Sequence, residues 1–162
     1  MNVFEYVFVS IYGARMSLST YQGQPLLIVN TASECEYTSQ YQGLEDLWMD
    51  YRQSGLIVLG IPCDDFGHHE PGDEDDIAEF CETKFHISFP MTGKYNLMGI
   101  SAHPMVNAIR EEFGDDATPR WNFYKYLFDR TGQMIGFWPS DVPPNDSAIT
   151  HQIECNLQSW VL

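Results

Sequence analysis

Two continuous apolar runs, with an amphipathic stretch between them, limit what this chain can fold into more than any other feature. Residues 26–30 (LLIVN) and 56–61 (LIVLGI) each suit a strand that is covered on both faces. Between them, apolar side chains recur in steps of three or four and predict a helix: Tyr41, Leu44, Leu47, Trp48 and Tyr51. A strand, a helix and a strand in this order imply two parallel strands with a right-handed crossover, and therefore an α/β fold.

The rest of the chain supplies further elements around this unit. Residues 3–20 alternate loosely around Tyr12-Gly13, which predicts an N-terminal β-hairpin. A helix is predicted to start at the acidic end of the 62–76 loop and to carry Ile77, Phe80, Cys81 and Phe85 on one face, and an extended piece follows at 87–90. A second helix runs from His103 through Ile109, and residues 126–128 form a hairpin with 134–138. Asp146 caps a last helix whose inward residues are Ile149, Ile153, Leu157 and Trp160. No linker or repeat interrupts them, so we expect one α/β domain over residues 1–162.

The charge balance argues against several classes of partner. The 162 residues include 8 Lys and Arg against 23 Asp and Glu, a formal net charge of −15. A chain with so few basic side chains is poorly suited to nucleic acid or to an anionic membrane surface. Its sequence has no run near the roughly 20 apolar residues that span a bilayer, and its first residues lack the basic region typical of a signal peptide. We therefore expect an acidic cytoplasmic protein with no nucleic-acid or membrane partner.

Acidic residues concentrate in residues 64–82, and the simplest interpretation is a solvated face that includes Glu70. A calcium site at residues 73–76 is the second interpretation, although the spacing lacks the alternating ligands and the glycine of an EF-hand loop. Adaptation to high salt is the third, and composition alone leaves it open. Adjacent histidines converge poorly on one ion, so we expect no metal site among His68, His69, Glu70 and Cys63.

Four cysteines are widely spaced, at positions 35, 63, 81 and 155, without a C-x-x-C pair. This spacing excludes a zinc ribbon and the thioredoxin redox motif. Cys35 follows the first buried strand at the point where a helix is predicted to begin, and a helix N-terminus favours the thiolate. A small buried core residue is the alternative for Cys35. We expect Cys63 to be structural and Cys155 to lie near the apolar face of the last helix.

Four sequence blocks form a distinctive series: N-T-A-S-E-C-E-Y-T (30–38), P-C-D-D-F-G-H-H-E-P-G (62–72), M-G-I-S-A-H-P (98–104) and W-N-F-Y-K-Y-L-F-D-R-T-G (121–132). They resemble the patterns N-V-A-S-x-C-G-x-T, P-C-N-Q-F-G-x-Q-E-P-G, N-G-x-x-A-H-P and W-N-F-x-K-F-L-x-D-x-x-G of the glutathione peroxidase family. The blocks follow the family order and spacing over about residues 20–140. Four matches in order make the resemblance specific.

The resemblance implies a thioredoxin-like fold, with three α/β/α layers around a central mixed sheet and an N-terminal hairpin. It also implies reduction of hydrogen peroxide or organic hydroperoxides by a nucleophilic sulfur, with a thiol reductant as co-substrate and no cofactor or metal. Cys35 would be the peroxidatic residue, which peroxide oxidises to a sulfenic acid. Trp121 and Asn122 would donate hydrogen bonds to the thiolate and to the developing charge. Without the resemblance, Trp121 suits a core aromatic and Asn122 a turn residue.

Two departures from the family pattern surround the predicted nucleophile. His69 stands where the family has Gln, and Glu36 stands where it has Gly, with Glu34 on the other side of Cys35. A carboxylate at roughly 7 Å works against the thiolate by about half to one pKa unit. Because a protonated imidazole would offset one carboxylate, we hypothesise that His69 compensates for Glu36. The altered set predicts reduced activity, and a redox-sensing or interaction protein is the alternative function.

Cys81 matches the position of the resolving cysteine in thioredoxin-dependent members of the family. It would attack the Cys35 sulfenic acid to form a disulfide after local unwinding, whereas the alternative is a residue that only fills the helix's apolar face. The presence of Cys81 and the few basic residues favour a thioredoxin-like protein over anionic glutathione as reductant. Only 16 residues separate Pro104 from Trp121, too few for the insertion of tetrameric members, so we expect a monomer or weak homodimer. The missing C-x-x-C counts against a disulfide-exchange oxidoreductase.

Overall fold

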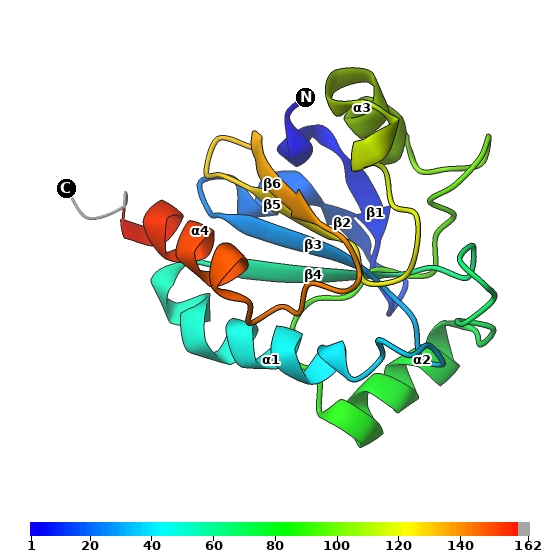
Figure 1. The fold of residues 1–162 in the computed structure, drawn as a ribbon. Coiled ribbons are helices and arrows are strands. Elements are labelled where there is room, and N and C mark those ends of the chain that lie inside the picture. The colour runs from blue at the N-terminus through cyan, green and yellow to red at the C-terminus, as the bar shows by residue number, and fades with distance from the viewer. Residues whose placement is uncertain (159–162) are drawn as a thin grey trace.

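The centre of the molecule is a four-stranded sheet with the strand order β4-β3-β5-β6 (Figure 1). The computed structural model describes residues 1–158. Strands β3 (Leu26–Thr31) and β4 (Ile57–Pro62) are parallel and buried along their whole length. The chain passes between them through α1 (Gln40–Tyr51), which confirms the predicted strand, helix and strand.

The second half of the sheet is antiparallel. Strand β5 (Lys125–Phe128) pairs with β3, and β6 (Met134–Trp138) pairs with β5, so the sheet is mixed, as expected. The chain then forms α4 (Ser147–Gln158), and the Asp146 carboxylate caps it by accepting the Ala148 N–H at 2.9 Å. The predicted inward residues Ile149, Ile153 and Leu157 are buried, whereas Trp160 lies outside the described residues.

Alternate residues of β3 face two separate apolar cores. Leu26 and Ile28 contribute to a core that α3 (Pro104–Phe113) covers. Leu27 and Val29 contribute to the core beneath α1 and α4. Figure 1 shows α3 on one side of the sheet and α1 and α4 on the other. This is the three-layer α/β/α arrangement that the sequence predicts.

The N-terminal hairpin is present but short. Strands β1 (Val7–Val9) and β2 (Arg15–Ser17) pair in antiparallel fashion around the predicted turn. Short 3-10 helices at Val3–Glu5 and Leu18–Tyr21 replace the outer parts of the predicted hairpin. Residues 87–90, predicted to be a short extended piece, form neither helix nor strand, and the isolated bridges of this segment lie directly after them at Met91 and Thr92.

Helix α2 (Glu74–Phe80) starts with a capping box, in which the Asp73 and Asp76 side chains accept each other's backbone N–H. The winding changes at Cys81–Phe85 to a π-helix, which ends at a left-handed residue, His86 (φ 52°). Helix α3 runs four residues past the predicted end and stops before Gly114. No helix among residues 1–158 has the length and apolar character needed to cross a membrane.

Lys125 is a fully buried cation in the middle of the sheet. Its Nζ donates to the Ser140 carbonyl at 3.1 Å and lies 3.4 Å from the Pro139 carbonyl. Burial lowers the pKa of Lys125 to about 7, and the charge of Asp141 opposes that shift in part. Since the unfolded chain binds a proton at Lys125 up to much higher pH, the folded protein gains stability as pH rises above about 7.

We predict that Lys125→Met abolishes this pH dependence. Between pH 6.5 and pH 9, the free energy of unfolding of the wild type should rise relative to the variant by about 2.5 kcal/mol. Urea denaturation at several pH values measures the difference, and Lys84→Met removes a charge from an exposed lysine as the control. Parallel curves for wild type and Lys125→Met would show that Lys125 keeps its proton in the folded state.

Candidate active site

A tight turn after β3 carries Cys35. The Thr38 hydroxyl accepts the Cys35 N–H at 2.9 Å and donates to the Ala32 carbonyl at 2.9 Å, which closes the turn from both ends. Helix α1 begins only at Gln40. The expectation that Cys35 lies at a helix N-terminus is therefore wrong, because the hydroxyl of Thr38 holds the residues between strand and helix in turns.

The Cys35 thiol is half-buried and sits among hydrogen-bond donors. Its Sγ accepts the Tyr37 N–H at 3.2 Å, and the Asn122 side chain also donates to it. Burial is the largest cause that raises the pKa of Cys35, and the Glu36 carboxylate raises it further. The Tyr37 N–H and the neighbouring Asn122 and Thr38 side chains lower it and do not compensate. The pKa is thus raised, not lowered, although the effect of Glu36 has the sign predicted from sequence.

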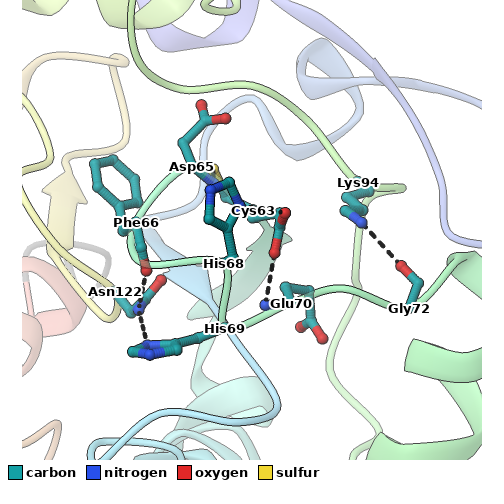
Figure 2. A network of polar contacts seen from close by, with 10 residues as sticks. Cys63, Asp65, Phe66, His68, His69, Glu70, Gly72, Lys94 and Asn122 are labelled. Carbon is teal, nitrogen blue, oxygen red and sulfur yellow. Dashed lines mark hydrogen bonds and ion pairs between the residues drawn. The ribbon is translucent and has the colours of Figure 1, made fainter.

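The 62–72 loop brings His69 beside Cys35. The Glu34 N–H donates to the His69 carbonyl at 3.0 Å and ties the two loops together. The Asp64 carboxylate accepts the Glu70 N–H at 3.0 Å and holds the loop in shape. Figure 2 shows the His69 ring directed toward Asn122, and the amide Nδ2 of Asn122 lies 3.3 Å from His69 Nδ1.

Asn30 fastens the third segment of the site. Its carbonyl accepts the Phe123 N–H at 2.7 Å, while its side chain donates to the Trp121 carbonyl at 2.8 Å and accepts the Tyr124 N–H at 2.9 Å. Phe123 takes a left-handed conformation (φ 63°) within this clamp. The fully buried Asn122 then donates to the Phe66 carbonyl at 3.0 Å, which joins this segment to the 62–72 loop (Figure 2).

Trp121 lies next to His69 but has an unused donor. The two rings meet edge to face with centroids 5.3 Å apart. The Trp121 Nε1 is buried and has no hydrogen-bond partner within the described chain. Trp121, Glu36 and Tyr37 line an open surface hollow of about 360 Å³. Its described lining contains two acids, Glu36 and Asp141, and no basic side chain.

Cys81 is buried at the junction of α2 and the π-helix. It belongs to the apolar core against which Cys35 packs. Burial raises the pKa of Cys81 to about 11, with Glu70 adding to the shift and the Tyr41 hydroxyl opposing it. All four cysteines lie in the described part of the chain and carry free thiols.

Two other thiols lie outside the site. Cys63 is fully buried, and burial raises its pKa to about 12, which suits an inert core residue. Cys155 is exposed, with its Sγ 3.6 Å from His151 Nε2 one turn earlier in α4. The expectation that Cys155 lies near the apolar face of the last helix is wrong, because Ile153 and Leu157 occupy that face.

Glu70 differs from the other acids of the 64–82 segment. It is 1% exposed, so the interpretation of a solvated face is wrong for this residue. Burial raises the pKa of Glu70 to about 7, although the neighbouring Ser33 and the charge of Lys94 oppose the shift. Figure 2 shows its carboxylate pointing away from His69, on the other side of the loop.

Sequence reasoning missed Asn30 as a positioning residue. Asn30 stands first in the N-T-A-S-E-C block, and the sequence patterns predicted no role for it. The signal was present, because an amide that directly follows an apolar run within a buried strand must find hydrogen-bond partners. Asn30 is 2% exposed and meets that requirement through the segment that carries Asn122.

Comparisons with known proteins agree with this geometry. The model of the glutathione peroxidase family matches residues 3–110. The chain is 39% identical over 150 residues to the glutathione peroxidase homolog BsaA of Bacillus subtilis (strain 168), covering 90% of this chain and 93% of that protein. It is 38% identical to the hydroperoxy fatty acid reductase gpx1 of Synechocystis sp. (strain ATCC 27184 / PCC 6803 / Kazusa), covering 84% and 85%. The solved apo structure of Trgpx matches with a TM-score of 0.77 and 30% identity, covering 98% of this chain and 97% of that one.

The layered mixed sheet, the N-terminal hairpin and a cysteine just after β3 define a thioredoxin-fold thiol peroxidase. The chain belongs to the glutathione peroxidase family. It is accordingly a thiol-dependent peroxidase, an oxidoreductase with a hydroperoxide substrate and a thiol reductant.

Gly67 offers a test of how closely the site is packed. It has a positive φ of 78°, and an added Cβ would lie 2.7 Å from Trp121 Cη2 and 3.1 Å from His69 Cε1. Gly13 has a similar φ of 88°, with nothing within 4 Å of the same added atom. Substitution by alanine strains the backbone at both positions by about 1–2 kcal/mol, but only Gly67→Ala displaces the two rings.

We predict that Gly67→Ala lowers the rate of peroxide consumption about ten- to a hundredfold, whereas Gly13→Ala leaves it close to wild type. Both variants should lose some thermal stability because both carry the backbone strain. Rates are measured below the melting temperature of the weaker variant. Equal rates for the two variants would show that the positions of Trp121 and His69 do not matter for the reaction.

Proposed function

We propose that Cys35 is the peroxidatic residue. Its thiolate attacks the distal oxygen of the hydroperoxide, the O–O bond breaks, and the sulfur becomes a sulfenic acid. The leaving oxygen takes up a proton and departs as water or alcohol. The sulfur is oxidised by two electrons and the peroxide is reduced by two, so this step needs no metal and no cofactor.

The observation that carries this proposal is the arrangement of donors around one half-buried sulfur. Cys35 Sγ receives the Tyr37 N–H and the Asn122 amide, and both contacts favour negative charge on sulfur. The buried indole N–H of Trp121 has no hydrogen-bond partner in the described chain, and the same residue lines the open surface hollow. In the proposed reaction, Asn122 stabilises the thiolate and Trp121 stabilises the developing charge on oxygen. His69 positions Asn122 through the contact at its Nδ1.

A lower activity than that of a standard family member is part of the proposal. The raised pKa of Cys35 means that less thiolate is present near neutral pH, and Glu36 contributes to that shift. Compensation of Glu36 by a charged His69 stays a hypothesis. The second candidate function is a slow redox sensor, which the same raised pKa favours.

The rate of peroxide reduction separates the two candidates. We predict that the reduced wild type consumes hydrogen peroxide much faster than a free thiol, and that Cys35→Ser abolishes this reaction. Cys155→Ser removes an exposed thiol as a matched control and should keep the wild-type rate. Stopped-flow measurement of peroxide loss provides the readout. A wild-type rate no higher than that of Cys35→Ser would rule out the peroxidase mechanism at Cys35.

We also propose that Cys81 resolves the sulfenic acid. It would attack Cys35 sulfur and release water, leaving a disulfide. Its thiol is buried, so this step requires opening of the segment that carries it. The π-helix that begins at Cys81 supports such opening, since its wider turns hold the backbone less well than an α-helix and often mark functional sites.

We predict that Cys81→Ser still reacts once with peroxide but fails to turn over with thioredoxin. The wild type should form a Cys35–Cys81 disulfide, seen by mass spectrometry as a linked peptide pair that has lost two hydrogen atoms. Cys63→Ser removes a buried thiol of the same kind and should not affect turnover. Full thioredoxin-dependent turnover by Cys81→Ser would show that Cys81 only fills the core.

We propose a thioredoxin-like protein as the physiological reductant in a cytoplasmic setting. The hollow beside Cys35 presents Glu36 and Asp141 and no basic side chain in its described lining, which is unfavourable for anionic glutathione. Four widely spaced cysteines are too few for a disulfide scaffold in a chain of this length, which suits a reducing compartment. Only one 3-10 turn, Asp115–Ala117, lies between α3 and the 121–124 segment, and this short passage supports a monomer or weak homodimer.

A further inference from the structure

Three side chains of different chemistry converge beside the reactive sulfur. Cys35, Glu36 and His69 each have a ligand atom, and these atoms all lie within 4.8 Å of one another. The hydrogen bond from the Glu34 N–H to the His69 carbonyl brings the two loops together. This set differs from the adjacent histidines considered from sequence, and in Figure 2 the His68 and His69 rings point apart.

Two members of this set are the departures from the family pattern described above. Where Glu36 and His69 stand, the family pattern has Gly and Gln. Glycine offers no side-chain ligand, and a neutral amide is a weak one. We propose that Cys35, Glu36 and His69 form a binding site for a divalent cation of the Zn²⁺ type, and that the ion reversibly blocks the peroxidase.

The separations fit one tetrahedral ion after small side-chain movements. Zn²⁺ binds sulfur at about 2.3 Å and nitrogen or oxygen at about 2.0–2.2 Å, so neighbouring ligand atoms lie about 3.3–3.6 Å apart. The present separations of up to 4.8 Å exceed this by about 1 Å. Glu36 is exposed and can close the gap by rotation of its side chain. Water fills the fourth position, since three protein ligands leave one open.

The surroundings favour a cation of intermediate softness. A thiolate and a carboxylate balance the two positive charges of the ion, and exposed Glu34 adds a further attraction. A sulfur and an imidazole nitrogen suit Zn²⁺ better than Mg²⁺ or Ca²⁺, which prefer oxygen ligands. The His69 ring is oriented by the Trp121 edge contact, and its 3.3 Å contact to Asn122 is long enough to give way to a metal bond.

Binding blocks catalysis because the ion and the peroxide need the same sulfur. Coordination replaces the S–H bond of Cys35 by a sulfur–metal bond and releases the proton to solvent. Zn²⁺ changes no oxidation state, so removal of the ion by a chelator restores the thiol. This site goes beyond the proposed function, because ion binding is measured without any turnover.

The experiment must first remove a competing surface pair. Cys155 and His151 are exposed residues of α4, and Cys155 Sγ lies 3.6 Å from His151 Nε2. This thiol and imidazole could bind a metal ion by themselves. All measurements therefore use the reduced Cys155→Ser protein as the parent. Co²⁺ serves as the spectroscopic probe, because a thiolate-to-cobalt charge-transfer band in the near ultraviolet reports sulfur coordination directly. Competition with Zn²⁺ then gives the relative affinity.

We expect one Co²⁺ per chain with a charge-transfer band that Cys35→Ser abolishes. Glu36→Gln and His69→Gln should each weaken binding at least about tenfold. Glu34→Gln is the matched control, since it removes the same charge from the other side of Cys35 but no ligand, and it should weaken binding less than about threefold. Zn²⁺ should slow peroxide consumption by the parent and by Glu34→Gln, with recovery on chelation, whereas Mg²⁺ should not.

Three results would overturn the proposal. The first is a band that persists in Cys35→Ser. The second is equal weakening by Glu34→Gln and Glu36→Gln, which would reduce the effect to general electrostatic attraction. The third is no charge-transfer band at all in a parent that still consumes peroxide, a result that would leave the peroxidase function intact and remove the metal site alone. Circular dichroism of each variant confirms that the comparison is made between folded proteins.

Discussion

The hydrogen bonds of Asn30 are the constraint on which the site depends. The residue is the next to last of β3 and uses both its backbone and its side chain to hold the 121–124 segment. That segment carries the donors of the site, and its left-handed Phe123 has no reason to persist in an unclamped loop. A buried amide that lost these partners would leave several polar groups unpaired, at a cost of about 1–3 kcal/mol for each. The strand that forms the core thus also positions Trp121 and Asn122.

The loops around Cys35 are joined to one another as well as to the sheet. Glu34 binds the His69 carbonyl, and Asn122 binds the Phe66 carbonyl, so the 62–72 loop is held from two sides. In each of these hydrogen bonds the acceptor is a backbone carbonyl of the 62–72 loop. The bond therefore does not depend on which side chain that loop residue carries. This explains how the chain can carry Glu36 and His69 in place of Gly and Gln while the loops keep their arrangement.

Much of the fold could be predicted from the sequence because burial has a periodic signature. The runs at 26–30 and 56–61, the helix between them and the hairpin of β5 and β6 all follow from the spacing of apolar side chains. The start of α1 could not be predicted, because the Thr38 hydroxyl captures backbone groups that a helix would otherwise use. The burial of Glu70 could not be predicted from the sequence for a different reason. Its neighbours in the sequence are exposed acids, and only the folding of the loop turns one of them inward.

The candidate site shows the same division between local pattern and long-range contact. Cys35, Trp121 and Asn122 could be named from motifs, yet no motif shows that burial outweighs three hydrogen bonds and raises the pKa of Cys35. As the proposed nucleophile, a thiol with a raised pKa is mostly protonated near neutral pH, so its reactivity would depend on groups that stabilise negative charge when substrate enters. The indole N–H of Trp121 has no hydrogen-bond partner in the described chain, and it is the donor proposed for that task. A cation bound between Glu36 and His69 would stabilise the same thiolate while denying it to peroxide. Glu36 therefore acts in opposite directions in the two states: in the metal-free protein it disfavours the charged sulfur, and with the proposed ion present the same carboxylate would help to hold it.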